Sequence, residues 1–257
     1  MRTLGLTSKR VMNLTGISRL FLLPLLAFCV VCTAWSNSAH AKSPSYSGKQ
    51  LADGFMRTVF GLEYNSWGSN AHQVKKYNGP VRIFIHNLAR KNRLPVAKRA
   101  VRQINRQIRG LSISSVKSAK SANFHLYIVD RRDYAKTVRK HIFRNQAAHV
   151  PGRCLVHVET SRNGISRSSA VIVSDEGEFL FKRCLIEETL QGLGPMNDDK
   201  RLVHSVFNDR SRHARFTKFD RYILNMLYDR RVKPGMSRAQ ANVVLPAVIR
   251  DCRKRLH

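Results

Sequence analysis

Two adjacent carboxylates, Glu187 and Glu188, begin the stretch of this 257-residue chain whose residue types and spacing best suit chemistry. Gln191, Gly194 and Asn197 follow at short, regular intervals. Residues four apart on a helix project from the same face, so Glu187 and Gln191 would lie side by side. A later glycine permits a sharp turn that can bring the Asn197 side chain back toward them. Such a group can hold a metal ion or a ligand while Glu188 serves as a general base.

The spacing matches H-E-x-x-H-x-x-G-x-x-H, the zinc-binding helix and turn of metzincin proteases. Glu187, Gln191 and Asn197 stand at the three histidine positions, whereas the general-base and turn-glycine positions are unchanged. Zinc in proteins prefers imidazole and thiolate ligands, so we expect no tight zinc site. Oxygen donors from these three residues, together with Asp198, suit calcium, magnesium or manganese better.

The same residues have other interpretations that need no metal. Their side chains could hydrogen-bond to the turn and to neighbouring strands, or Glu187 could pair with Lys182 or Arg183. A histidine from elsewhere, such as His125 or His157, could supply a missing ligand if it lined the same sheet. Since no histidine occupies a zinc position, we expect a binding site or a weak hard-ion site in preference to a hydrolase.

The first 41 residues have the pattern of a secretory signal peptide. Four basic residues and no acid precede an apolar run at residues 20–32, and Ala39-His40-Ala41 offers a cleavage site before Lys42. The apolar run is short for a membrane span of about 20 residues. We therefore expect residues 42–257 to form a single exported domain, periplasmic or secreted, without a transmembrane span.

The charge of the chain constrains its partners. Lys and Arg number 46 against 16 Asp and Glu, and the net charge is +30. The expected partners are an anionic envelope surface or polymer, such as lipopolysaccharide, lipid head groups or teichoic-type polymers, or a peptide. The sequence has no zinc-finger spacing and no RNA-recognition signature, so specific nucleic-acid binding is not expected. The alternative is that the charge only keeps the protein soluble.

Three cysteines remain after the expected cleavage: Cys154, Cys184 and Cys252. An oxidising compartment favours one disulfide and one leftover thiol. Pairing Cys154 with Cys184 would fix the helix that carries Glu187 and Glu188 to a strand. Cys252 is the expected free thiol, and Cys184–Cys252 is the alternative bridge.

Hydrophobic periodicity predicts an α+β fold. We expect a mixed sheet backed by a long helix, then the helix with Glu187 and Glu188, and then a helical C-terminal part. The predicted helices cover residues 50–62, 96–108, 134–143, about 181 onward, 219–228 and 239–252, and the predicted strands cover 81–85, 111–116, 124–129, 154–158 and 169–173. Asn163-Gly164 predicts a hairpin between the last two strands.

Four segments give the chain a family resemblance: 58–63, 184–198, 205–209 and 227–236. Through them the chain resembles exported bacterial proteins of domain-of-unknown-function family 2927, which brings no established activity. The resemblance implies a zincin-like core with Glu187 at the zinc-helix position. It also implies that Met236, after Pro234-Gly235, forms a methionine turn, and that residues 169–173 or a neighbouring strand form a sheet edge that pairs with bound peptide.

Overall fold

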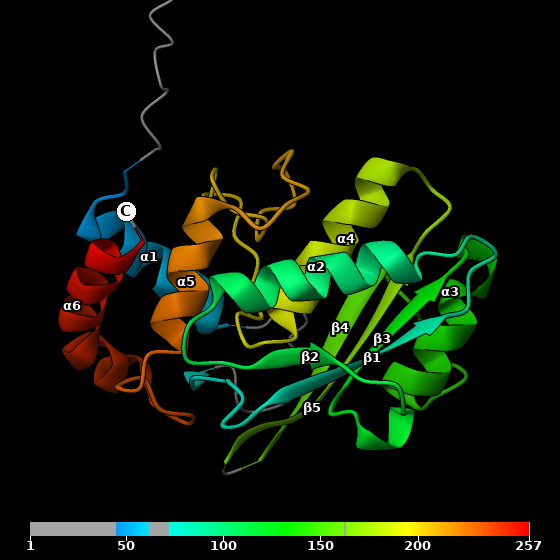
Figure 1. Ribbon diagram of the computed structural model, residues 1–257, viewed down its shortest axis with the longest axis horizontal. Helices are drawn as coiled ribbons and strands as arrows, with labels where there is room; N and C mark the ends of the chain where they lie inside the picture. Colours follow the sequence, from blue (N-terminus) through cyan, green and yellow to red (C-terminus); the bar gives the residue numbers. More distant parts are fainter. Residues whose placement is uncertain (1–44, 62–71, 162, 257) are drawn as a thin grey trace, which may run out of the picture. The chain divides into compact units, whose positions relative to one another are not determined.

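Short apolar segments form a five-stranded mixed sheet in the computed structural model (Figure 1). The strands are β1 (Val81–Asn87), β2 (Ile113–Ser115), β3 (Phe124–Val129), β4 (Cys154–Ser161) and β5 (Gly164–Val173). Their order is β2-β1-β3-β5-β4, and all neighbours are parallel except β4 and β5. The five predicted strands and the predicted hairpin are therefore confirmed.

The structure describes residues 45–61, 72–161 and 163–256. The expected signal peptide lies outside these residues and stays a prediction. The first predicted helix, 50–62, ends earlier than expected, at Val59, because Phe60 has an extended backbone with φ −109° and ψ 118°. The described residues form one compact unit. Within the described ranges, none of the helices combines the length and apolar character that crossing a membrane requires.

The sequence analysis expects residues 169–173 or a neighbouring strand to form a sheet edge, and β5, which contains 169–173, does not form one. Residues 169–173 lie inside the sheet, because β5 pairs with β3 on one side and β4 on the other. These residues are buried on both faces of the sheet, as an interior strand requires. The neighbouring strand β4 is the edge strand.

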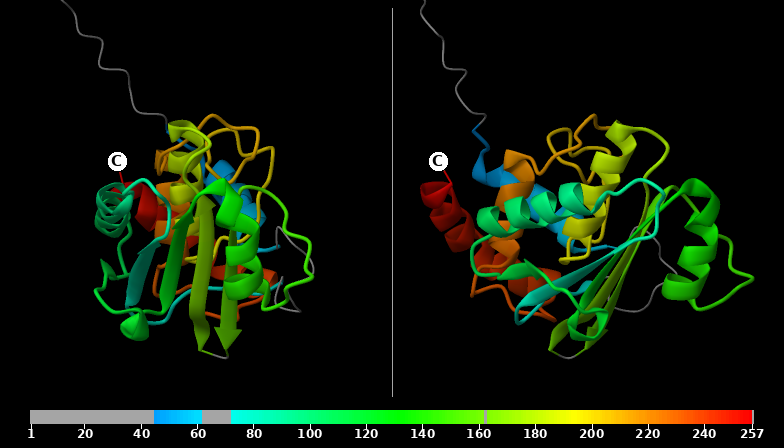
Figure 2. Two further views of the ribbon diagram at one scale, coloured as in Figure 1. Left: turned by 90° about the vertical axis from the view of Figure 1, so that its right-hand side faces the viewer. Right: turned by 45° about the vertical axis from the view of Figure 1, so that its right-hand side comes forward.

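Helices cover both faces of the sheet, and six α-helices occur in the described part of the chain. One face packs against α2 (Leu94–Gln107) and α4 (Glu178–Gln191), as Figures 1 and 2 show. The other face packs against α3 (Arg131–Val138) and the π-helical turn η4 (Arg139–Phe143). The remaining elements are α1 (Gly48–Val59), α5 (Lys218–Leu227), α6 (Arg238–Arg255) and a short 3-10 helix, η3 (Ala119–Ser121).

The long helix α2 follows from its apolar spacing. Ala97, Ala100, Val101 and Ile104 recur at intervals of three and four and are all buried. Pro95 lies in the first turn, where its missing N–H costs no helical hydrogen bond. This stripe packs into the main core with Ile83 and the other inward residues of the sheet.

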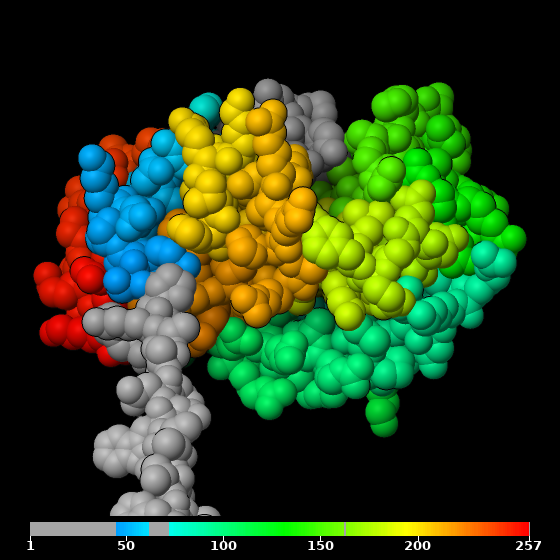
Figure 3. Space-filling model, turned by 90° about the horizontal axis from the view of Figure 1, so that it is seen from above, coloured from blue at the N-terminus to red at the C-terminus, as the bar shows by residue number. Residues whose placement is uncertain are grey.

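Helix α4 is buried almost all round at its C-terminal end. Every residue from 183 to 191 is buried, charged ones included. The segment that follows α4 forms part of this cover. Figure 3 shows it, coloured yellow to orange, on the surface between α1 and the exposed start of α4. The side chains of α4 must therefore satisfy their charges and hydrogen bonds inside the protein.

The predicted disulfide is confirmed. Cys154 at the start of β4 is bonded to Cys184 in α4, with a Cα–Cα distance of 5.8 Å. The bridge ties the edge strand to the buried helix. Cys252 is a free thiol, as expected, and it is buried within α6.

We expect the double variant Cys154→Ser/Cys184→Ser to lose about 3–4 kcal/mol in the free energy of unfolding, since the bridge closes a loop of about 30 residues. Urea denaturation of the wild type and the variant measures the difference. Cys252→Ser is the control and should leave the midpoint nearly unchanged. An equal midpoint for the double variant and the wild type would contradict the expected role.

Candidate functional site

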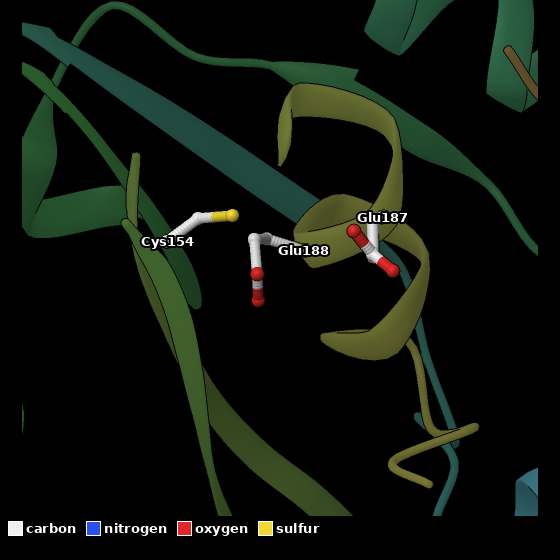
Figure 4. Close-up of side chains that lie close together, drawn as sticks. All are labelled: Cys154, Glu187 and Glu188. Atoms are coloured by element: carbon white, nitrogen blue, oxygen red, sulfur yellow. The ribbon is translucent and has the colours of Figure 1, made fainter. Parts of the chain in front are cut away.

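Glu187 and Glu188 leave α4 in different directions, as Figure 4 shows. Consecutive residues on a helix point about 100° apart. The Glu188 carboxylate lies between the helix and β4, on the side of Cys154, whereas the Glu187 carboxylate lies closer to the helix in this view. Both residues are buried, at 5% and 4% exposure. The two carboxylates nevertheless stay close, because an oxygen of Glu187 and an oxygen of Glu188 lie within 4.8 Å of each other.

Glu187 is held by an arginine of its own helix. Nη2 of Arg183 lies 2.7 Å from Oε1 of Glu187, and both side chains are buried. Lys182, the other partner considered for Glu187, is exposed. Arg183 is one helical turn before Glu187, which places the two side chains on the same face.

The same guanidinium also binds residues 206–213, which follow α4 and cover it and are called the covering segment below. Nη2 donates to the carbonyl oxygens of Val206 and Asn208, both at 3.1 Å. Nη1 lies 3.2 Å from Oγ of Ser211 and 3.3 Å from the carbonyl oxygen of His213. Arg183 therefore neutralises Glu187 and fixes the covering segment in one interaction.

Gln191 and Asn197 are also engaged. The amide nitrogen of Gln191 donates to Oδ1 of Asp198 at 3.0 Å. The amide nitrogen of Asn197 donates to the carbonyl oxygen of Arg57 at 2.8 Å, at the end of α1. The structure thus brings Gln191 and Asp198 together and directs the Asn197 amide toward α1.

Gly194 has the turning role predicted for it. Helix α4 ends at Gln191, and Gly194 has φ +134°. A Cβ atom there would lie 2.1 Å from the carbonyl oxygen of Lys75, so no other residue fits without displacing that backbone. Met236 lies at a different turn, where its carbonyl oxygen accepts a hydrogen bond from the Val74 amide. The methionine-turn assignment stays a prediction.

The donor set does not fit zinc. Oxygens of Glu187, Asp198 and Asp209 lie within 4.8 Å of one another, and none of these donors is an imidazole or a thiolate. A second close group pairs Cys154 with the two glutamates, but its sulfur belongs to the disulfide. Arg183 lies 2.7 Å from Glu187 and 3.7 Å from Asp209. Its guanidinium therefore already balances negative charge in the group of Glu187, Asp198 and Asp209.

Sequence reasoning missed Asp209 as a neighbour of Glu187. Asp209 lies 22 positions after Glu187 in the chain, and no helical or turn spacing connects the two. The contact forms because Arg183 holds the carbonyl groups beside Asp209 against α4. The available signal was that Asp209 closes the segment 205–209, one of those that carry the family resemblance.

His125 and His157 cannot complete a site around Glu187, because they lie on the face of the sheet opposite α4. They alternate with the inward residues of β3 and β4, on the face that α3 and η4 cover. Nδ1 of His125 lies 3.2 Å from Nε2 of His86, and Nε2 of His125 lies 3.2 Å from Nη1 of Arg167. Because Arg167 only donates, His125 donates in turn to His86, which fixes both rings as neutral tautomers.

Comparison with known proteins places the chain in a family. A family model described as "Protein of unknown function (DUF2927)" matches residues 48–247. The chain belongs to this family. The family resemblance drawn from the sequence is thereby confirmed, and the family description assigns no activity. A search of curated proteins returned no match.

We expect Arg183→Ala to cost about 3–5 kcal/mol of unfolding free energy, because it leaves Glu187 buried without its cation. Urea denaturation of Lys182→Ala, an exposed neighbour of the same helix, is the control, with an expected change within about 0.5 kcal/mol. The double variant Arg183→Met/Glu187→Leu should recover much of the loss. Similar losses for the two single variants would argue against a structural role of the ion pair.

The histidine cluster predicts a loss of stability on acidification. Burial, then the nearby His125 and His141, lower the pKa of His86 to about 4 from an ordinary value of 6.5. Burial also lowers the pKa values of His125, His141 and His157. Between pH 6.5 and about 4 the unfolded chain therefore binds more protons than the folded protein, so unfolding becomes easier as the pH falls.

Thermal melting across this pH range tests the effect, with His86→Asn expected to flatten the slope and the exposed His149→Asn expected to leave it unchanged. Burial raises the pKa of Asp220 to about 6, which gives an opposite contribution in every variant. The readout is therefore the difference from the wild type. An equal slope for the wild type and His86→Asn would contradict the prediction.

Proposed function

We propose that this protein is a non-catalytic, exported binding protein for an anionic envelope component, built on a zincin-like core. The observation that carries the proposal is the buried ion pair between Arg183 and Glu187, 2.7 Å apart. An arginine side chain occupies the surroundings of the first ligand position, where a metallopeptidase would need a metal. In this proposal α4 supports the fold and does not hold a catalytic metal.

The zincin-like assignment is supported by the place of α4 in the fold. This helix follows the β4–β5 hairpin directly and packs on the sheet. It keeps a buried glutamate at the general-base position, Glu188, and a glycine at the turn, Gly194. Proteolysis is disfavoured because the residues at all three zinc positions make contacts within the protein.

The anionic ligand is supported by the distribution of charge. The chain has 46 basic and 16 acidic residues, so most cations have no acidic counterpart. Several acids each take two arginines: Asp199 pairs with Arg57 and Arg201, and Asp229 pairs with Arg231 and Arg255. Cations that lie outside these pairs and face solvent attract polyanions.

A divalent-metal-dependent hydrolase is the second candidate function. The observation in its favour is the oxygen cluster of Glu187, Asp198 and Asp209. Close to it, Oε1 of Gln191 is buried and has no hydrogen-bond partner among the described residues. Oxygen ligands of this kind suit calcium, magnesium or manganese. The competing cation Arg183 weighs against this candidate.

Purified protein without the leader tests both functions in one series. We expect no stoichiometric zinc by elemental analysis after dialysis, no peptide hydrolysis above that of Glu188→Gln, and binding to lipopolysaccharide. The affinity should fall as the salt concentration rises, because exposed charges are screened.

Other outcomes would overturn the proposal. Stoichiometric zinc together with peptidase activity that Glu188→Gln abolishes would establish a metallopeptidase. Retained calcium or manganese that supports hydrolysis would establish the second candidate, provided that Asp198→Asn/Asp209→Asn loses the ion and the exposed control Asp133→Asn keeps it. Absence of lipopolysaccharide binding at low salt would remove the binding function.

A further inference from the structure

A large pocket lies outside the α4 motif, where the ends of helices α2, α5 and α6 meet. It has a volume of about 930 Å³ and is lined by residues 76–80, 109–112 and 228–234 and by the end of α6. We call it the basic pocket, because seven Lys or Arg residues line it against two Asp residues. Its volume is within the range of about 300–1,000 Å³ that is typical of small-molecule sites.

The two acids of the basic pocket are already neutralised. Asp229 accepts from Nε and Nη2 of Arg231, both at 2.8 Å, and lies 3.6 Å from Arg255. Asp251 lies 2.8 Å from Nη1 of Arg231. Four cations remain that form no ion pair within the described ranges and are exposed at the pocket: Arg109, Arg230, Lys233 and Lys254.

The walls of the basic pocket are fixed by buried hydrogen bonds. Nζ of Lys76, a buried residue, donates to the carbonyl oxygens of Leu227 at 2.7 Å and Val232 at 2.9 Å. Asn225 accepts from the amide of Arg109 at 2.9 Å and donates to the carbonyl oxygen of Gln107 at 2.7 Å. The two Asn225 bonds join the ends of α2 and α5, which lie side by side in Figure 1. The pocket is therefore preformed.

Helix ends offer a competing explanation for the cations. Helices α2, α5 and α6 all end at the pocket, and each C-terminus carries about half a negative charge, about −1.5 in total. The side chains contribute a formal excess of five positive charges, from seven cations and two acids. An excess of about +3.5 remains, so the helix ends do not account for the cations.

The size of this excess indicates the ligand. A phosphate monoester carries about −1.5 to −2, so two such groups supply about −3 to −4. Guanidinium groups bind phosphoryl oxygens through paired N–H donors, and lysines add point charges. We infer that the basic pocket binds a ligand with two phosphoryl groups on a small scaffold, such as a bisphosphorylated sugar. This inference rests on the proposed function, since both require an anionic ligand.

A matched pair of variants tests the inference. Arg230→Gln/Lys254→Gln removes two cations of the basic pocket, and Lys98→Gln/Arg99→Gln removes one lysine and one arginine from the exposed face of α2. The two variants have the same net charge. Calorimetric titration with glucose bisphosphate and glucose monophosphate measures free phosphoryl ligands. Phosphatidylcholine vesicles with or without diphosphoryl lipid A measure a membrane head group.

We expect the wild type to prefer the bisphosphate and the pocket variant to bind it about tenfold more weakly, with the α2 variant within about twofold of the wild type. The same pattern with lipid A vesicles alone would also support the inference and would identify the source as a head group. Equal weakening in both variants would overturn it and leave the proposed function intact. Absence of binding to either probe would also overturn it, and lipopolysaccharide binding then decides the proposed function separately.

Discussion

Burial of a charged helix is the constraint on which the rest of this structure depends. Helix α4 takes Arg183, Glu187, Glu188 and Gln191 out of water together. An unpaired charge in such a place costs several kcal/mol, so each group needs a partner within the fold. The segment after α4 supplies carbonyl and hydroxyl oxygens to Arg183, and Arg183 supplies the positive charge to Glu187. The covering segment and the helix therefore stabilise each other.

This arrangement shows which contacts hold the residues of the metzincin-like spacing in place. The helix, the turn glycine and the sheet position depend on packing, not on a metal. Gly194 is required because the Lys75 backbone passes close to its Cα, and this contact is independent of any ligand. The disulfide between Cys154 and Cys184 also fixes α4, because it joins this helix to β4.

The small number of acidic residues determines the charge of the surface. Buried aspartates bind hydroxyl, backbone and arginine groups and hold them in place. Asp220, fully buried, accepts hydrogen bonds from Ser205 and Thr217 and completes the capping box of α5. Asp229 holds two arginines at the end of α5. Few acids are left to balance exposed lysines and arginines, so the cations of the basic pocket face solvent without ionic partners in the described structure.

The sequence by itself determined the secondary structure and the class of fold, because apolar spacing within one segment decides which face that segment can bury. It favoured the Cys154–Cys184 bridge and left Cys184–Cys252 open, and the structure decided between the two. The four-residue interval between Arg183 and Glu187 made their ion pair a possibility. Only tertiary packing decided that this pair is buried and that Asp209 joins it. Packing also decided that β5 lies inside the sheet and that His125 faces away from α4. These outcomes depend on segments far apart in the chain, and no periodicity within a segment records which distant backbone will pack against it.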